Sequence, residues 1–240
     1  MLKNKYIGDK AFYKMVLAIA VPIMIQNAIS NFVGLLDNLM IGRVGTNALS
    51  GVAIANQLMF IYYLLVFGAA AGIGIFTAQY LGIGDINGIR YTFRMKLIVN
   101  TVITIISVVV LYILGASLIS LYLNGEGAAS DASETLRIGR VYMNIMLIGL
   151  VPNAWTQAYA GTLRETGETR VPMYASFAAV FINLIGNYIL IYGHLGLPAL
   201  GAAGAAYATV ISRFIELGIL SVYTHRNVNK HPFISGALRS

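Results

Sequence analysis

The chain has 240 residues, of which 58% are hydrophobic and only 10% are charged, and its mean hydropathy is +0.75. A soluble domain carries about 25% charged residues, so a soluble globule of this composition could not cover its own surface. Intrinsic disorder is also excluded, because it needs low hydrophobicity and high charge. The apolar excess predicts a polytopic membrane protein whose side chains mostly face lipid. The chain has no cysteine, which excludes disulfides and thiolate metal sites.

Six stretches are apolar enough to cross a bilayer, which takes about 20 mostly apolar residues. In chain order they lie at approximately 14–41, 51–80, 95–122, 136–163, 171–192 and 200–224. The connections between them are short and contain turn or charged residues, as at 82–88 and 124–127. No low-complexity linker divides the chain. Residues 1–240 are therefore predicted to form one all-α integral membrane unit of six transmembrane helices.

Most of the lysines and arginines fall on one side of this predicted bundle. They occupy the N-terminus, the connection after the second span, the connection between the fourth and fifth spans, and the tail. Lys96, at the start of the third span, is counted with these connections. Basic loops stay in the cytoplasm, so both termini are predicted to be cytoplasmic in a multi-pass protein of the cell membrane. The basic residues behind the net charge of +7 are therefore interpreted as orienting the protein in the membrane, and no nucleic-acid partner is expected.

The first span carries a polar face opposite an apolar one. At about 100° per residue, Gln26, Ser30 and Asp37 fall on the polar face, with Asn27 beside them. Asp37 is the only acid well inside the first five predicted spans. An ionisable group at such depth costs about 2.5 kcal/mol or more and usually marks an ion or proton path. The alternative is that Asp37 lies near the outer interface and is simply hydrated.

Later spans add polar side chains whose roles the residues alone leave open. Gln57 in the second span either lines a cavity or bonds a neighbouring helix. Asn183 and Asn187 share a face of the fifth span, where they either bridge helices or offer oxygens to a cation. The runs of small residues at 68–74 and 201–208 predict close helix packing.

A polar row at helical spacing lies in the sixth span and consists of Thr209, Arg213 and Glu216. The two charged members can pair at i, i+3. An unpaired arginine at this depth would be costly, so the row should face the bundle interior. The pair is either a structural ion pair or an element of ion coupling.

The sequence contains no H-E-x-x-H, P-loop or G-x-S-x-G motif, and its histidines lie outside the predicted spans. We therefore expect no enzyme, no resident metal and no cofactor. Any active transport would draw on an ion gradient or on another subunit.

Three stretches together carry a family pattern. They are VPIMIQN at 21–27 with GLLD at 34–37 and IGRVG at 41–45, then GTLRETGETRVPM at 161–173, and GAAGAAYATVIS at 201–212. In order and spacing they resemble the MATE family (multidrug and toxic compound extrusion). Members are secondary transporters that export cationic or amphiphilic compounds in exchange for H⁺ or Na⁺, and they have two six-helix lobes. The resemblance implies that this chain is the N-terminal lobe of a 6+6 transporter. The second lobe is absent from the chain and would be its partner, from the same gene or as a second chain.

The resemblance also implies a coupling site. In many members, an acid on the first span and Asn, Asp and Thr side chains on the fifth and sixth spans bind a proton or cation. By position these are Asp37, Asn183 and Thr209, and Asn187 stands where several members have a second Asp. That exchange removes a negative charge and favours a site centred on Asp37, with Na⁺ at Asp37, Asn183 and Thr209 as the alternative to H⁺. The tentative substrate cavity consists of Gln26, Asn27, Gln57, Arg213 and Glu216.

Two other functions fit a chain of six spans. One is a flippase for a lipid-linked precursor, from the related superfamily, which needs a cationic cavity for a pyrophosphate. Arg213 is the sole candidate cation, and Glu216 would neutralise it. The other is an inactive fragment or an assembly partner that does not transport by itself. The identity of the transported compound is not encoded in these patterns.

Overall fold

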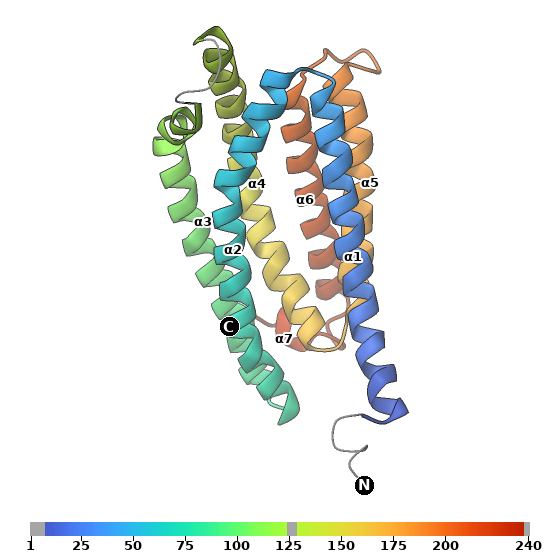
Figure 1. Ribbon diagram of the computed structural model, residues 1–240. Helices are drawn as coiled ribbons and strands as arrows, with labels where there is room; N and C mark the ends of the chain where they lie inside the picture. Colours follow the sequence, from blue (N-terminus) through green and yellow to red (C-terminus); the bar gives the residue numbers. More distant parts are fainter. Residues whose placement is uncertain (1–7, 124–128, 238–240) are drawn as a thin grey trace.

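The computed structural model describes residues 8–123 and 129–237, and its regular elements in this part of the chain are helices (Figure 1). Six long helices run alongside one another: α1 (Lys10–Gly42), α2 (Thr46–Gly82), α3 (Ile86–Leu123), α4 (Ala129–Glu165), α5 (Arg170–Tyr192) and α6 (Ala202–Arg226). A single turn, α7 (Pro232–Ser235), follows them. The loop predicted at 124–127 lies outside the described residues. Each of the six predicted spans lies on one of the six long helices, although the helices extend beyond several predicted limits.

Among the described residues, five of these helices, all except α4, are long and apolar enough to cross a membrane. Their outer side chains are mainly large aliphatic and aromatic groups that remain exposed, as lipid-facing surfaces require. α4 has similar length but is more polar, and it packs against α2, α3 and α6. Polar side chains along its middle, such as Asn153 and Thr156, are therefore buried in protein. The predicted span at 136–163 is supported by the place of α4 among the other helices and not by its hydropathy.

Glycines let several of the helices approach one another closely. A Cβ atom added to Gly51 on α2 would lie 2.9 Å from the backbone nitrogen of Gly139 on α4, and one added to Gly204 would lie 2.5 Å from the oxygen of Leu190. The predicted close packing at 201–208 is thus confirmed. The prediction for 68–74 is confirmed in part: a Cβ on Gly74 would meet Glu165, whereas Gly68 and Gly72 have nothing within 4 Å of that position. Those two glycines point away from the other helices of the lobe.

The helix after the second connection begins earlier than predicted. α3 begins at Ile86 instead of residue 95, because Asp85 caps it by accepting a hydrogen bond from the backbone N–H of Gly88 at 3.0 Å. The preceding turn uses Gly84, whose φ of +73° favours glycine. The basic residues of this region therefore project from helix and not from a loop.

The end of the chain is folded against the bundle. After the sixth predicted span, α6 continues to Arg226 and α7 then packs on α3. Arg94 on α3 donates a hydrogen bond to the oxygen of Ala237 at 2.6 Å. Ile234 is fully buried in this contact. The sequence patterns do not reveal this docking, because a four-residue helix carries too little periodicity to be detected.

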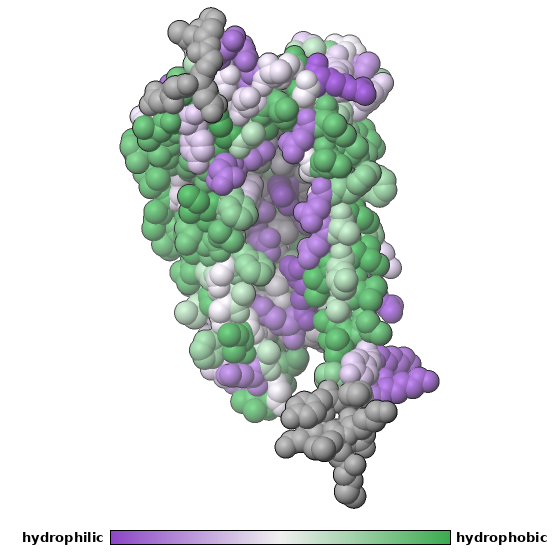
Figure 2. All heavy atoms as spheres, viewed as in Figure 1, coloured by the Kyte–Doolittle hydropathy of each residue, from purple (hydrophilic) through white to green (hydrophobic). Residues whose placement is uncertain are grey.

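α1 is the helix least enclosed by its neighbours. It packs mainly on α5, touches α2 and α6 less, and leaves most of its side chains exposed. Figure 2 shows hydrophilic side chains gathered along the hollow between α1 and α2, with hydrophobic surface on both sides. The polar face predicted for the first span therefore looks into this hollow.

The docking of α7 should depend on pH through His231. Its ring is buried between Tyr223 and Phe233, and burial, helped by Lys230, lowers the pKa of His231. A histidine whose folded pKa is depressed stabilises the docked state above its unfolded pKa of about 6.5. That contribution is lost as the pH falls through the lower, folded pKa.

We therefore expect amide hydrogen exchange in residues 231–237 to accelerate on acidification below about pH 6.5, beyond the known chemical pH dependence of exchange. The variant His231→Phe keeps an aromatic ring and should abolish this extra effect. An equal acceleration in His231→Phe would contradict the assignment.

Candidate functional site

The hollow between α1 and the rest of the bundle contains three adjoining cavities. The largest, of about 490 Å³, lies toward the end where α1 begins and α6 ends. This end, here called the basic end, carries Lys10, Lys14, Arg90, Arg94, Arg170, Arg226 and Lys230. Two smaller cavities, of about 170 Å³ and about 250 Å³, both border Asp37. All three cavities share Arg213 as a lining residue.

Asp37 is joined to α5 by a short hydrogen bond. Its Oδ1 accepts from Nδ2 of Asn187 at 2.5 Å. The same Nδ2 donates to Oδ1 of Asn183 at 3.3 Å, and Nδ2 of Asn183 donates to Oγ1 of Thr209 at 3.1 Å. The structure thus brings the four predicted coupling residues, from α1, α5 and α6, into one chain of hydrogen bonds, here called the Asp37 cluster. It consists of Asp37, Asn183, Asn187 and Thr209.

One oxygen of the Asp37 cluster is left without a partner. Asn187 is fully buried, and within the described residues its Oδ1 accepts no hydrogen bond. The amide orientation follows from the network, since Nδ2 faces two acceptor oxygens, on Asp37 and Asn183. A buried acceptor without a donor is costly. The cluster therefore offers a carboxylate and a spare amide oxygen, the oxygen ligands that bind a proton or a small hard cation.

The other predicted residues divide between the cavity and the surface. Gln26 and Asn27 line the cavity of about 490 Å³, together with Arg213 and Glu216. Arg213 and Glu216 form the ion pair expected from their spacing, at 3.4 Å. Gln57 is exposed and does not line these cavities. Its prediction as a cavity residue is not supported, because α2 turns the neighbouring Asn56 toward the cavity instead.

Two contributors to the polar interior were not predicted. Tyr142 donates a hydrogen bond to Oδ1 of Asn56 at 3.3 Å, and both line the cavity that borders Asp37. Lys96 on α3 is fully buried and forms an ion pair with Glu165 at the end of α4. Its assignment to a basic loop is therefore wrong, because α3 begins ten positions earlier and carries Lys96 into the bundle. The partners are 69 positions apart, so no local pattern could have revealed the pair.

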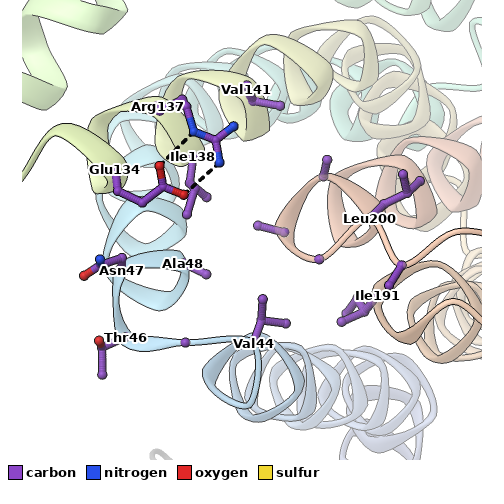
Figure 3. A pocket seen from close by; sticks show the side chains of 15 residues that line it. Val44, Thr46, Asn47, Ala48, Glu134, Arg137, Ile138, Val141, Ile191 and Leu200 are labelled. Atoms are coloured by element: carbon purple, nitrogen blue, oxygen red, sulfur yellow. Dashed lines mark hydrogen bonds and ion pairs between the residues drawn. The ribbon is translucent and has the colours of Figure 1, made fainter. Parts of the chain in front are cut away.

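A further cavity, of about 580 Å³, lies at the opposite end of the bundle (Figure 3). Glu134 and Arg137 on α4 bond each other through two hydrogen bonds, of 2.8 and 2.7 Å, and Val44 and Ile191 lie across the cavity from them. The hydrogen bonds from Arg137 hold the pKa of Glu134 below its usual value. Because this pair is exposed and satisfied along its own helix, it leaves no free charge for a ligand.

Comparisons with known proteins agree with this geometry. A family model described as MatE matches residues 22–189, and the chain belongs to that family. Two curated relatives are both named "Probable multidrug resistance protein NorM". The one from Thermotoga maritima is 27% identical over 87% of this chain and 43% of its own length. The one from Halalkalibacterium halodurans is 30% identical over 87% of this chain and 44% of its own length. The chain thus spans less than half the length of these relatives.

Solved structures show the same fold. The eukaryotic MATE transporter AtDTX14 superposes with a TM-score of 0.78 at 18% identity, over 93% of this chain and 47% of that one. An outward-facing MATE family transporter of the MOP superfamily gives 0.75 at 22% identity, over 92% and 46%. The chain therefore has the fold of about half of a MATE transporter, as the sequence resemblance predicts.

The Lys96–Glu165 pair should contribute strongly to stability. Replacing Glu165 with Gln leaves Lys96 buried without a counter-charge, which should lower the free energy of unfolding by about 3–5 kcal/mol. The double variant Lys96→Met/Glu165→Gln should recover much of this loss. Glu134→Gln breaks an exposed pair and should change stability little. Titration of the purified protein with denaturing detergent measures all three. Equal effects of Glu165→Gln and Glu134→Gln would contradict the role given to burial.

Proposed function

We propose that this chain is the N-terminal lobe of a secondary transporter that exports cationic or amphiphilic compounds in exchange for H⁺ or Na⁺. Membership of the MatE family and the names of the two relatives, both called multidrug resistance proteins, support export of drugs. The observation that carries the proposal is the Asp37 cluster, in which an acid inside a membrane helix accepts a hydrogen bond from Asn187 and is linked through it to Asn183 and Thr209, beside open cavities. Ionisable groups at such depth are costly and are usually retained for ion movement.

The cluster couples ion binding to helix position through one hydrogen bond. An ionised Asp37 accepts the hydrogen bond of Asn187 and holds α1 against α5. α1 packs mainly on α5 and less on α2 and α6, so this bond lies within its main interface. A proton or Na⁺ that neutralises Asp37 weakens that charge-assisted bond. α1 is then free to shift, which changes access to the cavities between α1 and α2.

The proposed orientation places the basic end in the cytoplasm, in agreement with the positive-inside rule. The cavity of about 490 Å³ would then receive compounds from the cytoplasmic side, and the Asp37 cluster would lie deeper in the membrane. The open face between α1 and α2 is polar (Figure 2), and we propose that a second lobe covers it. That lobe would belong to the same gene product or to a second chain.

A flippase for a lipid-linked precursor is less well supported. The candidate cation for a pyrophosphate was Arg213, and Arg213 is instead paired with Glu216. An assembly partner without transport of its own is addressed directly by assaying the chain alone. Reconstituted into liposomes without a second lobe, it should bind a cationic dye but not export it against a gradient, if two lobes form the complete pathway.

Replacing Asp37 with Asn should abolish coupled export while leaving membrane insertion intact. Asn is nearly the same size as Asp but cannot exchange a proton or supply a full negative charge. The assay is efflux of a cationic dye from cells, or from liposomes under an imposed H⁺ or Na⁺ gradient, with the chain in its complete transporter. Asp131→Asn, which removes an exposed acid at the opposite end, is the matched control. Export by Asp37→Asn with an unchanged response to pH and Na⁺ would overturn the proposal.

A further inference from the structure

The cavity at the basic end contains a guanidinium that forms no direct ion pair with a described acid. Its charged lining residues are Arg164, Glu165, Arg213 and Glu216. Glu165 is paired with the buried Lys96, and Arg213 with Glu216. Arg164 forms no ion pair with any described residue. Both acids of the cavity are thus bound to a nearer cation, which leaves one guanidinium available.

The one hydrogen bond of Arg164 within the described residues leaves its two terminal amino groups free to bind a ligand. Nε donates to the backbone oxygen of Ala160, one turn earlier on α4, at 3.1 Å. This bond directs the side chain back along the helix, as expected for a long helical side chain. The two terminal amino groups have no partner among the described residues. They form the fork that binds a carboxylate in bidentate geometry.

A second unpaired donor faces the same cavity. Thr156 is only 4% exposed and lines the cavity, and its Oγ1 has no hydrogen-bond partner in the described part of the chain. Buried hydroxyl groups are normally hydrogen-bonded, so an unpaired one calls for a missing partner. Thr156, Ala160 and Arg164 follow one another at i, i+4 and i+8 and therefore share one face of α4. The small side chains of Ala160 and Gly161, which also line the cavity, leave room between the hydroxyl and the guanidinium.

From this arrangement we propose that Arg164 and Thr156 form a subsite for a carboxylate. The cavity continues toward Asp37, because it shares Ser30, Ser176, Arg213 and Glu216 with the cavity of about 170 Å³ that Asp37 borders. The hollow thus presents a free cation near the basic end and an acid deeper inside. If the proposed export function holds, the transported compounds include amphoteric molecules, with the carboxylate at Arg164 and the cationic group toward Asp37.

The subsite is tested by binding two dyes that differ in one charge. Rhodamine B has a free carboxylate, and its ethyl ester has the same cationic ring system without that negative charge. Binding is measured by fluorescence anisotropy with the purified chain in nanodiscs of neutral phosphatidylcholine. Arg164→Gln should weaken binding of the acid about tenfold, since it removes a hydrogen-bonded charge, and leave the ester unchanged. Arg164→Lys should retain part of the affinity for the acid, because it keeps the charge but loses the fork.

Two further variants separate recognition from damage to the fold. Thr156→Val removes the hydroxyl without changing the shape and should weaken binding of the acid alone. Arg140→Gln, which removes an exposed arginine from the same helix, should affect neither dye. Equal loss of both dyes in Arg164→Gln, or no loss of either, would overturn the subsite. It would also be overturned if phosphatidylglycerol competed with the acid at Arg164, because the site would then hold a lipid phosphate.

The result is independent of the proposed export function, since this assay uses no ion gradient and no second lobe. Loss of acid binding in Arg164→Gln supports the subsite even where Asp37→Asn leaves export unchanged. Conversely, Asp37→Asn can abolish export as expected while Arg164→Gln weakens binding of both dyes equally. The export proposal then stands and the subsite is overturned.

Discussion

The hydrogen bond from Asn187 to Asp37 is the contact on which the proposed coupling depends, because it links the least enclosed helix to α5. α2, α3, α4 and α6 are held together by close helix packing, including the glycine contact between Gly51 and Gly139. α1 lacks such packing and meets mainly α5. Polar groups buried away from water need partners, and on α1 this requirement is met through a charged acid at the cavity. The least packed helix is therefore attached by a group whose charge can change.

α4, in contrast to α1, is packed on several sides by other helices. It is surrounded by α2, α3 and α6 and carries polar groups that would be unfavourable in lipid. Lys96 fixes the end of α4 through Glu165, which in turn lies where a Cβ on Gly74 would be. Polar interiors of this kind are stable only when their members are satisfied. Two of the unsatisfied buried atoms of the described residues, Oδ1 of Asn187 and Oγ1 of Thr156, belong to the Asp37 cluster and to the cavity at the basic end, where a bound ion or compound would complete the network.

Sequence patterns predicted the elements and one face of the site well. Apolar stretches located the six long helices, and helical periodicity placed Asp37 on the polar face of α1. Family resemblance grouped Asp37 with Asn183, Asn187 and Thr209, which the hydrogen bonds then join. Periodicity gives the face of a residue but not its partner on another helix. For this reason the patterns missed the Lys96–Glu165 pair and the contact of Tyr142 with Asn56, and chose Gln57 where its neighbour lines the cavity. The docking of α7 was missed because its contacts, not its length, stabilise it.

The most direct test is whether Asp37 itself binds the coupling cation. Infrared difference spectra of the purified protein in lipid, recorded on acidification and on addition of Na⁺ at alkaline pH, report protonation or cation binding at single carboxylates. The account predicts a carboxylate signal that one of these two changes removes and that is absent in Asp37→Asn. The same signal in wild type and Asp37→Asn would contradict it, because the responding acid would then lie elsewhere.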